Sequence, residues 1–135
     1  MYLLDTNVVS ELRRPRPHPA VVEWIRQIPA DQLFVSAVTI GEIQAGIEIT
    51  REHDATRADE LEAWLGQVID SFSVLPADGA AFQEWARLKH RQPDSLMEDA
   101  LIAAVAVVHQ LTVATRNERD FDQLGVVSFN PFEGG

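Results

Sequence analysis

Short apolar segments alternate with longer segments of helical periodicity, and this alternation constrains the fold more than any other feature. Strand character is found at 2–4, 33–36, 72–76, 111–115 and 126–129. Helical spacing of apolar residues predicts helices at 7–13, 20–28, 38–50, 55–70, 78–91 and 101–110. Strands that alternate with helices pair in parallel through right-handed crossovers. We therefore expect an α/β domain of three layers, a central parallel β-sheet flanked by α-helices.

Length and composition narrow the possible classes. A chain of 135 residues is expected to form a single domain over 1–135. It contains no cysteine, which excludes disulfides, cysteine-ligated zinc and thiol nucleophiles. Neither a membrane span nor a secretory signal is predicted, so we expect a cytoplasmic protein. The net charge of -10 argues against a general phosphate-binding surface, but it would suit a basic partner or bound cations.

Acidic residues follow the predicted strands at the points where a parallel sheet forms its sites. Asp5 comes directly after the first strand, and Glu42 lies in the opening turns of the helix after the second. Asn117 and Asp120 follow the strand at 111–115. Sites in open α/β sheets form outside the carboxyl ends of the strands. We therefore expect these side chains to share one edge of the sheet.

Each of these carboxylates also has a purely structural interpretation. Asp5 could cap the following helix through the amide of residue 7 or 8, and on its own this is as good an explanation as metal binding. Glu42 could belong to a capping box with Thr39. Asp120 could cap or complement the dipole of a short helix after Asn117.

Asp99 is harder to explain structurally. Ser95 and Glu98 already match a capping box at the start of the buried helix, which leaves Asp99 without a capping role. A carboxylate at the edge of the core costs several kcal/mol unless a positive charge compensates it. Complementing the helix dipole at a partly hydrated end is the alternative. A set of carboxylate ligands favours Mg²⁺ or Mn²⁺ over zinc, and such sites serve phosphoryl chemistry.

Four segments in order resemble the four motifs of the PIN-domain family: LLDTNVVSEL, SAVTIGEIQAGI, EDALIAAVA and TVATRNERDF. The final VVSFNPFEGG resembles the end of the VapC and FitB-like branch. The similarity extends from residue 2 to about residue 132, and four motifs in the family's order form a specific signal. On these residues the chain resembles a VapC-like toxin of a type II toxin–antitoxin pair.

The resemblance implies a PIN fold, often dimeric, and a ribonuclease that depends on Mg²⁺, with Mn²⁺ as a possible substitute. It implies that Asp5, Glu42 and Asp99 bind the metal and take part in catalysis. Asp120 would add a fourth catalytic acid, although Asn117 occupies the place where some FitB-like members have that acid. The implied partners are RNA and a VapB/FitA-like antitoxin, through which alone the complex would contact operator DNA.

Further residues are expected to have supporting roles. The hydroxyls of Thr6 and Thr115, and the amide of Asn117, are expected to support the carboxylates. Arg13, Arg14 and Arg116 lie beside the motifs and could bind RNA phosphate, although each could equally be an ordinary solvated charge.

Two other functions are compatible with the sequence. One is a PIN-like regulatory subunit with little nuclease activity that acts mainly in a DNA-binding complex with its antitoxin. The other is a metal-dependent phosphatase, and this alternative is weakened because the segment DTN lacks the second aspartate of a DxD pair.

Trp24 and Trp64 could line an apolar groove for the antitoxin, or belong to the core.

Overall fold

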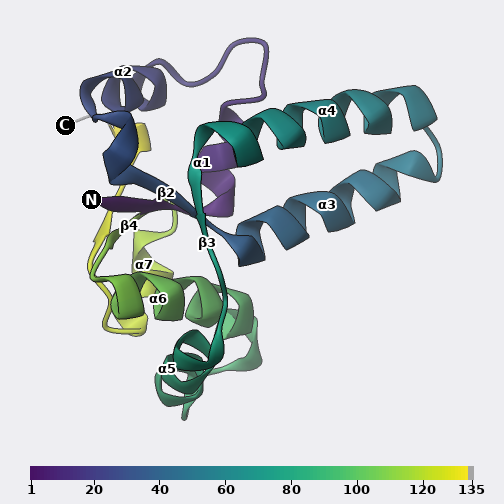
Figure 1. Cartoon of the computed structure of the whole chain (residues 1–135). Coiled ribbons are helices and arrows are strands. Elements are labelled where there is room, and N and C mark those ends of the chain that lie inside the picture. Colours follow the sequence, from purple (N-terminus) through teal and green to yellow (C-terminus); the bar gives the residue numbers. More distant parts are fainter. Residues whose placement is uncertain (134–135) are drawn as a thin grey trace.

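The computed structural model describes residues 1–133, and its centre is a parallel sheet of five strands (Figure 1). The strands are β1 (Tyr2–Leu4), β2 (Leu33–Ser36), β3 (Ser73–Leu75), β4 (Thr112–Ala114) and β5 (Ser128–Phe129). Their order across the sheet is β3-β2-β1-β4-β5, and every pair is parallel. The predicted α/β class with a parallel sheet is confirmed. Gly134 and Gly135, the end of the predicted domain, lie outside the described residues.

Seven α-helices and three short 3-10 helices connect the strands within the described part of the chain. The α-helices are α1 (Thr6–Glu11), α2 (Pro19–Gln27), α3 (Ala37–Arg51), α4 (Ala55–Ser71), α5 (Gly79–Lys89), α6 (Met97–His109) and α7 (Glu118–Gln123). The 3-10 helices are η1 (Ala30–Gln32), η2 (Asp94–Leu96) and η3 (Pro131–Glu133). No helix within residues 1–133 is long and apolar enough to cross a membrane.

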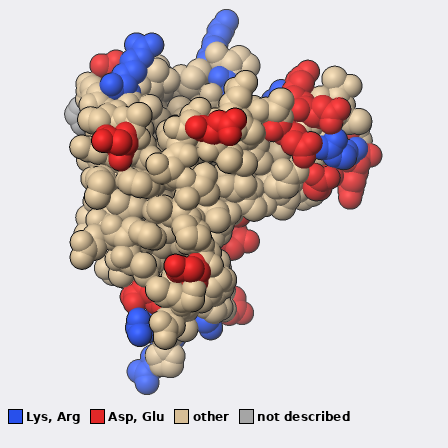
Figure 2. All heavy atoms as spheres, in the orientation of Figure 1, with Lys and Arg blue, Asp and Glu red and all other residues tan. Residues whose placement is uncertain are grey.

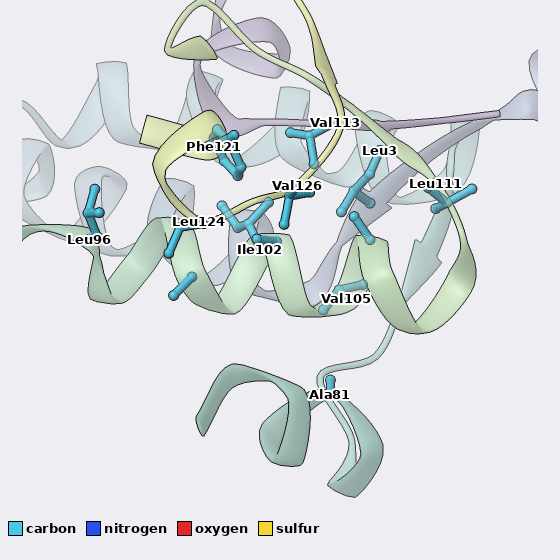
Figure 3. Packing of buried hydrophobic residues seen from close by; sticks show 13 residues of the cluster. Leu3, Ala81, Leu96, Ile102, Val105, Leu111, Val113, Phe121, Leu124 and Val126 are labelled. Atoms are coloured by element: carbon cyan, nitrogen blue, oxygen red, sulfur yellow. The ribbon is translucent and has the colours of Figure 1, made fainter. Parts of the chain in front are cut away.

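The sheet separates two apolar cores. Two adjacent residues of β1 contribute one side chain to each core. Leu3 packs against α6 and α7, where Ile102 and Phe121 are buried with it (Figure 3). Leu4 faces the other way and packs with residues of α1 to α4, among them Val8 and Leu65. Because side chains alternate along a strand, this arrangement gives the expected three layers.

The helices α3 and α4 form a hairpin whose far end projects from the body of the molecule (Figure 1). Acidic side chains crowd this end (Figure 2). Arg51, the last residue of α3, contacts Glu48 of its own helix over 3.2 Å. It joins α3 to α4 through contacts of 2.7 Å with Asp59 and 3.3 Å with Glu62. Much of the negative charge is therefore carried by the hairpin end, away from the sheet.

Two predicted capping boxes are not formed. The helix α3 begins at Ala37, with the Ser36 hydroxyl accepting from the N–H of Val38, so Thr39 lies inside the helix and is buried. The helix α6 begins at Met97, directly after η2, and its cap position is Leu96 without a side-chain hydrogen bond. Continuity with the preceding 3-10 turn replaces the cap that Ser95 was expected to provide.

Candidate active site

Side chains with oxygen ligands gather at a single edge of the sheet, where β1, β2 and β4 have their carboxyl ends. Leu4 pairs in register with Val35 on one side and with Ala114 on the other. Asp5 follows Leu4, and its backbone N–H donates to the carbonyl of Ala114 over 2.9 Å. Asp5 therefore lies where β1 meets β4, the point at which the strand order changes direction and α/β sheets form sites.

Asp5 is nearly inaccessible to solvent and accepts three hydrogen bonds. One carboxylate oxygen accepts from the backbone N–H of Thr6 over 2.8 Å, so Asp5 does cap α1, although through residue 6 rather than 7 or 8. The other oxygen accepts from the hydroxyl of Thr115 over 2.8 Å and from the amide of Asn7 over 3.3 Å. Burial raises the pKa of Asp5, and its hydrogen bonds with Thr115 and Thr6 oppose that rise.

Thr115 is the centre of this hydrogen-bond network. Its buried hydroxyl donates to Asp5 and accepts from the backbone N–H of Asn117 over 2.9 Å. It also lies 3.4 Å from the side-chain amide of Asn7, whose oxygen accepts from the N–H of Arg116 over 3.2 Å. Asn7 was not predicted as a site residue, although its place two positions after Asp5 in the first motif was a signal.

Glu42 lies in the second turn of α3 and is half-buried. Its Oε1 atom is buried and has no hydrogen-bond partner. Burial, followed by the negative charges of Glu98 and Asp5, raises the pKa of Glu42 to about 7. The hydroxyl of Thr6 lies 3.1 Å from that of Thr39, which joins the start of α1 to α3 beside this carboxylate.

Asp99 lies in the first turn of α6 and faces the same group of acids. Burial, followed by the charge of Asp5, the contact with Asp120 and the charge of Glu42, raises the pKa of Asp99 to about 7. Asp120, in the first turn of α7, therefore contacts Asp99. Asn117 is exposed, and its side chain does not cap α7. The four predicted acids influence one another electrostatically, which their sequence positions alone could not establish.

The donor chemistry of this cluster fits a hard divalent cation. Within residues 1–133, none of the ion pairs involves Asp5, Glu42, Asp99 or Asp120, so no protein cation offsets their mutual repulsion. Mg²⁺ needs only a few carboxylates and completes its shell with water. Among the described residues, however, no three Asp, Glu or His side chains already surround one point. The cluster supplies the ligand type, and metal binding would have to draw the side chains together.

The three predicted phosphate-binding arginines differ in their surroundings. Arg13 lines a pocket together with Glu42, and Arg116 follows Thr115. Arg14 is exposed and lies 3.8 Å from the buried carboxylate of Glu11. Arg13 and Arg116 therefore adjoin the acidic cluster more directly than Arg14 does.

A pocket of about 220 Å³ opens between α1, α3 and α4. It is lined by Thr6, Ser10, Arg13, Glu42, Ile43, Gly46, Ile47, Thr50, Leu61 and Trp64. The other tryptophan considered for a groove, Trp24, packs instead against Tyr2 and Phe129, with ring centroids 4.9 Å and 5.4 Å away. Apolar helix surface thus leads directly to the carboxylate of Glu42.

Comparison with known proteins agrees with this fold. The model of the family described as the PIN domain matches residues 2–127 of this chain. The chain is 31% identical to toxin FitB of Neisseria gonorrhoeae, and the match covers 98% of this chain and 99% of that one. It is 34% identical to VapC ribonuclease Y4jK of Sinorhizobium fredii, with the same coverage.

A solved structure of FitAB bound to the IR36 DNA fragment contains a chain of the same fold. Its TM-score is 0.84 at 32% identity, and the match covers 98% of this chain and 96% of that chain. The chain therefore belongs to the PIN domain family, as its four motifs predicted.

Proposed function

We propose that this protein is the toxin of a type II toxin–antitoxin pair and that it hydrolyses RNA phosphodiester bonds with the help of Mg²⁺. The observation that carries the proposal is the group of mutually repelling carboxylates at the sheet edge, formed by Asp5, Glu42, Asp99 and Asp120. A relative named as a VapC ribonuclease and another named as a toxin support the same activity.

Asp5, Asp99 and Glu42 would hold Mg²⁺, or Mn²⁺ in its place, and Asp120 would support Asp99. When bound, the cation supplies Lewis-acid stabilisation of the charge that develops on the scissile phosphate. Asp5 reaches its position because Thr6 and Thr115 direct hydrogen bonds at its two oxygens. These bonds hold the carboxylate in one orientation and favour its charged form.

Glu42 is the residue best placed to accept a proton from the attacking water. Its buried Oε1 has no hydrogen-bond partner. In the metal-free protein its pKa is raised to about 7, and a bound cation would lower it and keep the carboxylate ionised as a general base at neutral pH. Arg13 and Arg116, at the margins of the cluster, would bind the phosphates of the RNA on either side of the reacting group. The resemblance to the family implies a 3′-hydroxyl leaving group.

The pocket beside Glu42 supports the proposal of an antitoxin partner. Its apolar wall, which includes Ile43 and Trp64, would accept an amphipathic segment of a VapB/FitA-like protein. The unpaired Glu42 oxygen at the same place would accept a basic side chain from that segment. By analogy with the FitAB complex named as bound to a DNA fragment, operator DNA would be contacted through the antitoxin. The resemblance to the family further implies a toxin homodimer within that assembly.

Cleavage assays with the purified protein test the nuclease. Single-stranded RNA is incubated with Mg²⁺, Mn²⁺ or EDTA, and wild type is compared with Asp5→Asn and Asp99→Asn. We expect cleavage with either metal and none with EDTA or in the two variants. Asp94→Asn is the matched control, because Asp94 is exposed on η2 and belongs to no acidic contact described above. Cleavage that persists in EDTA would refute the role of the cation.

A second function has one observation in its favour. A chain of this fold is found in a complex named as bound to DNA, so the protein could act mainly as a regulatory subunit with little nuclease activity. A folded wild type that binds its antitoxin and the promoter DNA but cleaves no cellular RNA would support this alternative over the first.

A further inference from the structure

The side chain of Arg116 is held against an aromatic ring beside the acidic cluster. Its guanidinium carbon lies 3.8 Å from the centroid of the Phe132 ring. The backbone N–H of Arg116 donates to the side-chain oxygen of Asn7 over 3.2 Å, and Asn7 itself contacts Asp5. Both the backbone and the side chain of Arg116 are therefore fixed next to the proposed catalytic carboxylates.

Phe132 is in turn held by its own contacts. It lies in η3, which packs against α2 near the C-terminal end of the chain (Figure 1), and it is only 8% exposed. Its backbone N–H donates to the side-chain oxygen of Asn130 over 2.9 Å. Its ring meets that of His18 edge to face, with centroids 5.7 Å apart and planes at 76°. These contacts fix the ring on which Arg116 rests.

Stacking leaves the hydrogen-bonding capacity of Arg116 available. The five N–H donors of a guanidinium lie in its plane, whereas contact with a ring uses its face. Within residues 1–133, Arg116 makes no ion pair, while Arg51, Arg57 and Arg87 direct their donors at carboxylates of their own helices or hairpin. An exposed, pre-oriented fork of donors is suited to bidentate contact with a phosphate.

We propose that Phe132 is a positioning residue that holds the guanidinium of Arg116 ready for an RNA phosphate. The C-terminal η3 then forms part of the substrate-binding surface, although Phe132 itself touches no reacting atom. Pre-orientation lowers the conformational freedom that Arg116 would lose on binding, so the contribution falls on substrate affinity rather than on the chemical step. This inference rests on the proposed function, because it takes RNA as the substrate.

The test compares Phe132→Leu and Phe132→Trp with wild type. The steady-state kcat and KM are measured on a single-stranded RNA with Mg²⁺, and the Kd for the same RNA is measured by fluorescence anisotropy in EDTA. We expect Phe132→Leu to raise KM and Kd about threefold to tenfold and to leave kcat within about twofold of wild type. Phe132→Trp keeps an aromatic face and should stay within about twofold of wild type in all three.

Two further comparisons distinguish a positioning role of Phe132 from a general effect of its substitution on the structure. In an Arg116→Ala background, Phe132→Leu should cause no additional rise in KM or Kd, because the residue through which it acts is gone. Phe129→Leu is the matched control: this ring belongs to the same C-terminal segment but packs on Tyr2 and Trp24 rather than on an arginine. If Phe132→Leu fails to fold, Phe132→Met provides the same test, because it also replaces the aromatic face by an apolar side chain.

The inference is overturned by an unchanged Kd in Phe132→Leu, by an equal effect of Phe129→Leu, or by additive losses in the double variant. Failure of the proposed function is distinguishable from these results. If the wild type cleaves no RNA, the nuclease proposal fails, whereas the comparison of Kd values still decides whether Phe132 positions Arg116.

Discussion

The hydroxyl of Thr115 donates to the carboxylate of Asp5 over 2.8 Å, although 110 positions separate the two residues in the chain. This bond connects the end of β4 to the end of β1, and it is buried. It links the first and the fourth motif at one point. The orientation of Asp5 therefore depends on correct pairing of the two central strands.

Replacing Thr115 by Val should destabilise the protein by about 1–3 kcal/mol, because it leaves a buried carboxylate oxygen of Asp5 with only the longer contact of 3.3 Å from the Asn7 amide. RNA cleavage should fall as well, since Asp5 loses the contact that orients it. The free energy of unfolding is measured by urea titration and the activity by RNA cleavage. Thr115→Ser is the control, because it keeps the hydroxyl, and it should retain most of both quantities. Equal stability of Thr115→Val and wild type would show that the bond contributes little.

Asp99→Asn should abolish cleavage and yet stabilise the metal-free protein. The substitution removes a charge whose burial and acidic neighbours raise its pKa to about 7. Because Asp99 is only partly buried, solvent screening limits the expected gain at pH 8 to about 1 kcal/mol. Urea unfolding in EDTA measures it, with Asp94→Asn as the exposed control. A clear loss of stability in Asp99→Asn would indicate that its carboxylate has a structural role instead.

The stability of the metal-free protein should fall as the pH rises from about 4 to about 8. The folded pKa values of Glu42 and Asp99 are about 7, against ordinary values of 4.5 and 3.8. Between these limits the folded state binds more protons than the unfolded state, so the free energy of unfolding decreases with pH. Thermal unfolding at several pH values in EDTA measures this trend.

Mg²⁺ should oppose the same trend, because it binds the ionised carboxylates. The increase in Tm on adding Mg²⁺ should therefore be larger at pH 8 than at pH 5. Asp99→Asn should respond weakly at both pH values. A Tm that rises with pH in EDTA would contradict the raised pKa values.

The parallel sheet and most helix positions followed from apolar periodicity, because periodicity reports which side chains are buried. The strand 33–36 was predicted at its observed limits, and Leu3 and Leu4 belong to opposite cores as a strand requires. Helix starts were less predictable. A capping box is a local pattern, and at α6 the preceding η2 turn overrides it, whereas at α3 Ser36 takes the cap ahead of Thr39.

The acidic cluster was predictable as a set but not in its details. The rule that sites form at the carboxyl ends of strands brings Asp5, Glu42 and Asp120 to one edge, whereas Asp99 was predicted from its place at the start of the buried helix. It gives no information on side-chain contacts across the sheet, so the part played by Asn7 was missed. The contact of Arg116 with Phe132 was equally hidden, because it depends on how the C-terminal segment returns to the site.

Asp120→Asn should reduce cleavage much more than Asn117→Ala. Asp120 contacts Asp99 and helps to raise its pKa, whereas the Asn117 side chain is exposed and makes no cap. Removing the charge of Asp120 should also lower the pKa of Asp99, which a shift in the pH dependence of stability in EDTA would reveal. A larger loss of activity in Asn117→Ala than in Asp120→Asn would favour Asn117 as the fourth functional position.

Glu42→Gln separates proton transfer from substrate binding. The amide keeps the shape of the side chain but cannot accept a proton, so kcat should fall by about 10²–10⁴, the usual contribution of a general base. At a saturating concentration of Mg²⁺, which offsets the loss of one carboxylate ligand, the KM should stay constant or decrease, because one negative charge beside the phosphate is lost. In the wild type, kcat should rise with pH and level off at or below about pH 7, since Mg²⁺ favours the charged form of Glu42. Glu52→Gln, at the exposed C-terminal end of the same helix, is a control for the loss of one negative charge, and it should leave that pH profile unchanged. A Glu42→Gln variant that retains the wild-type profile would assign the proton transfer to another group.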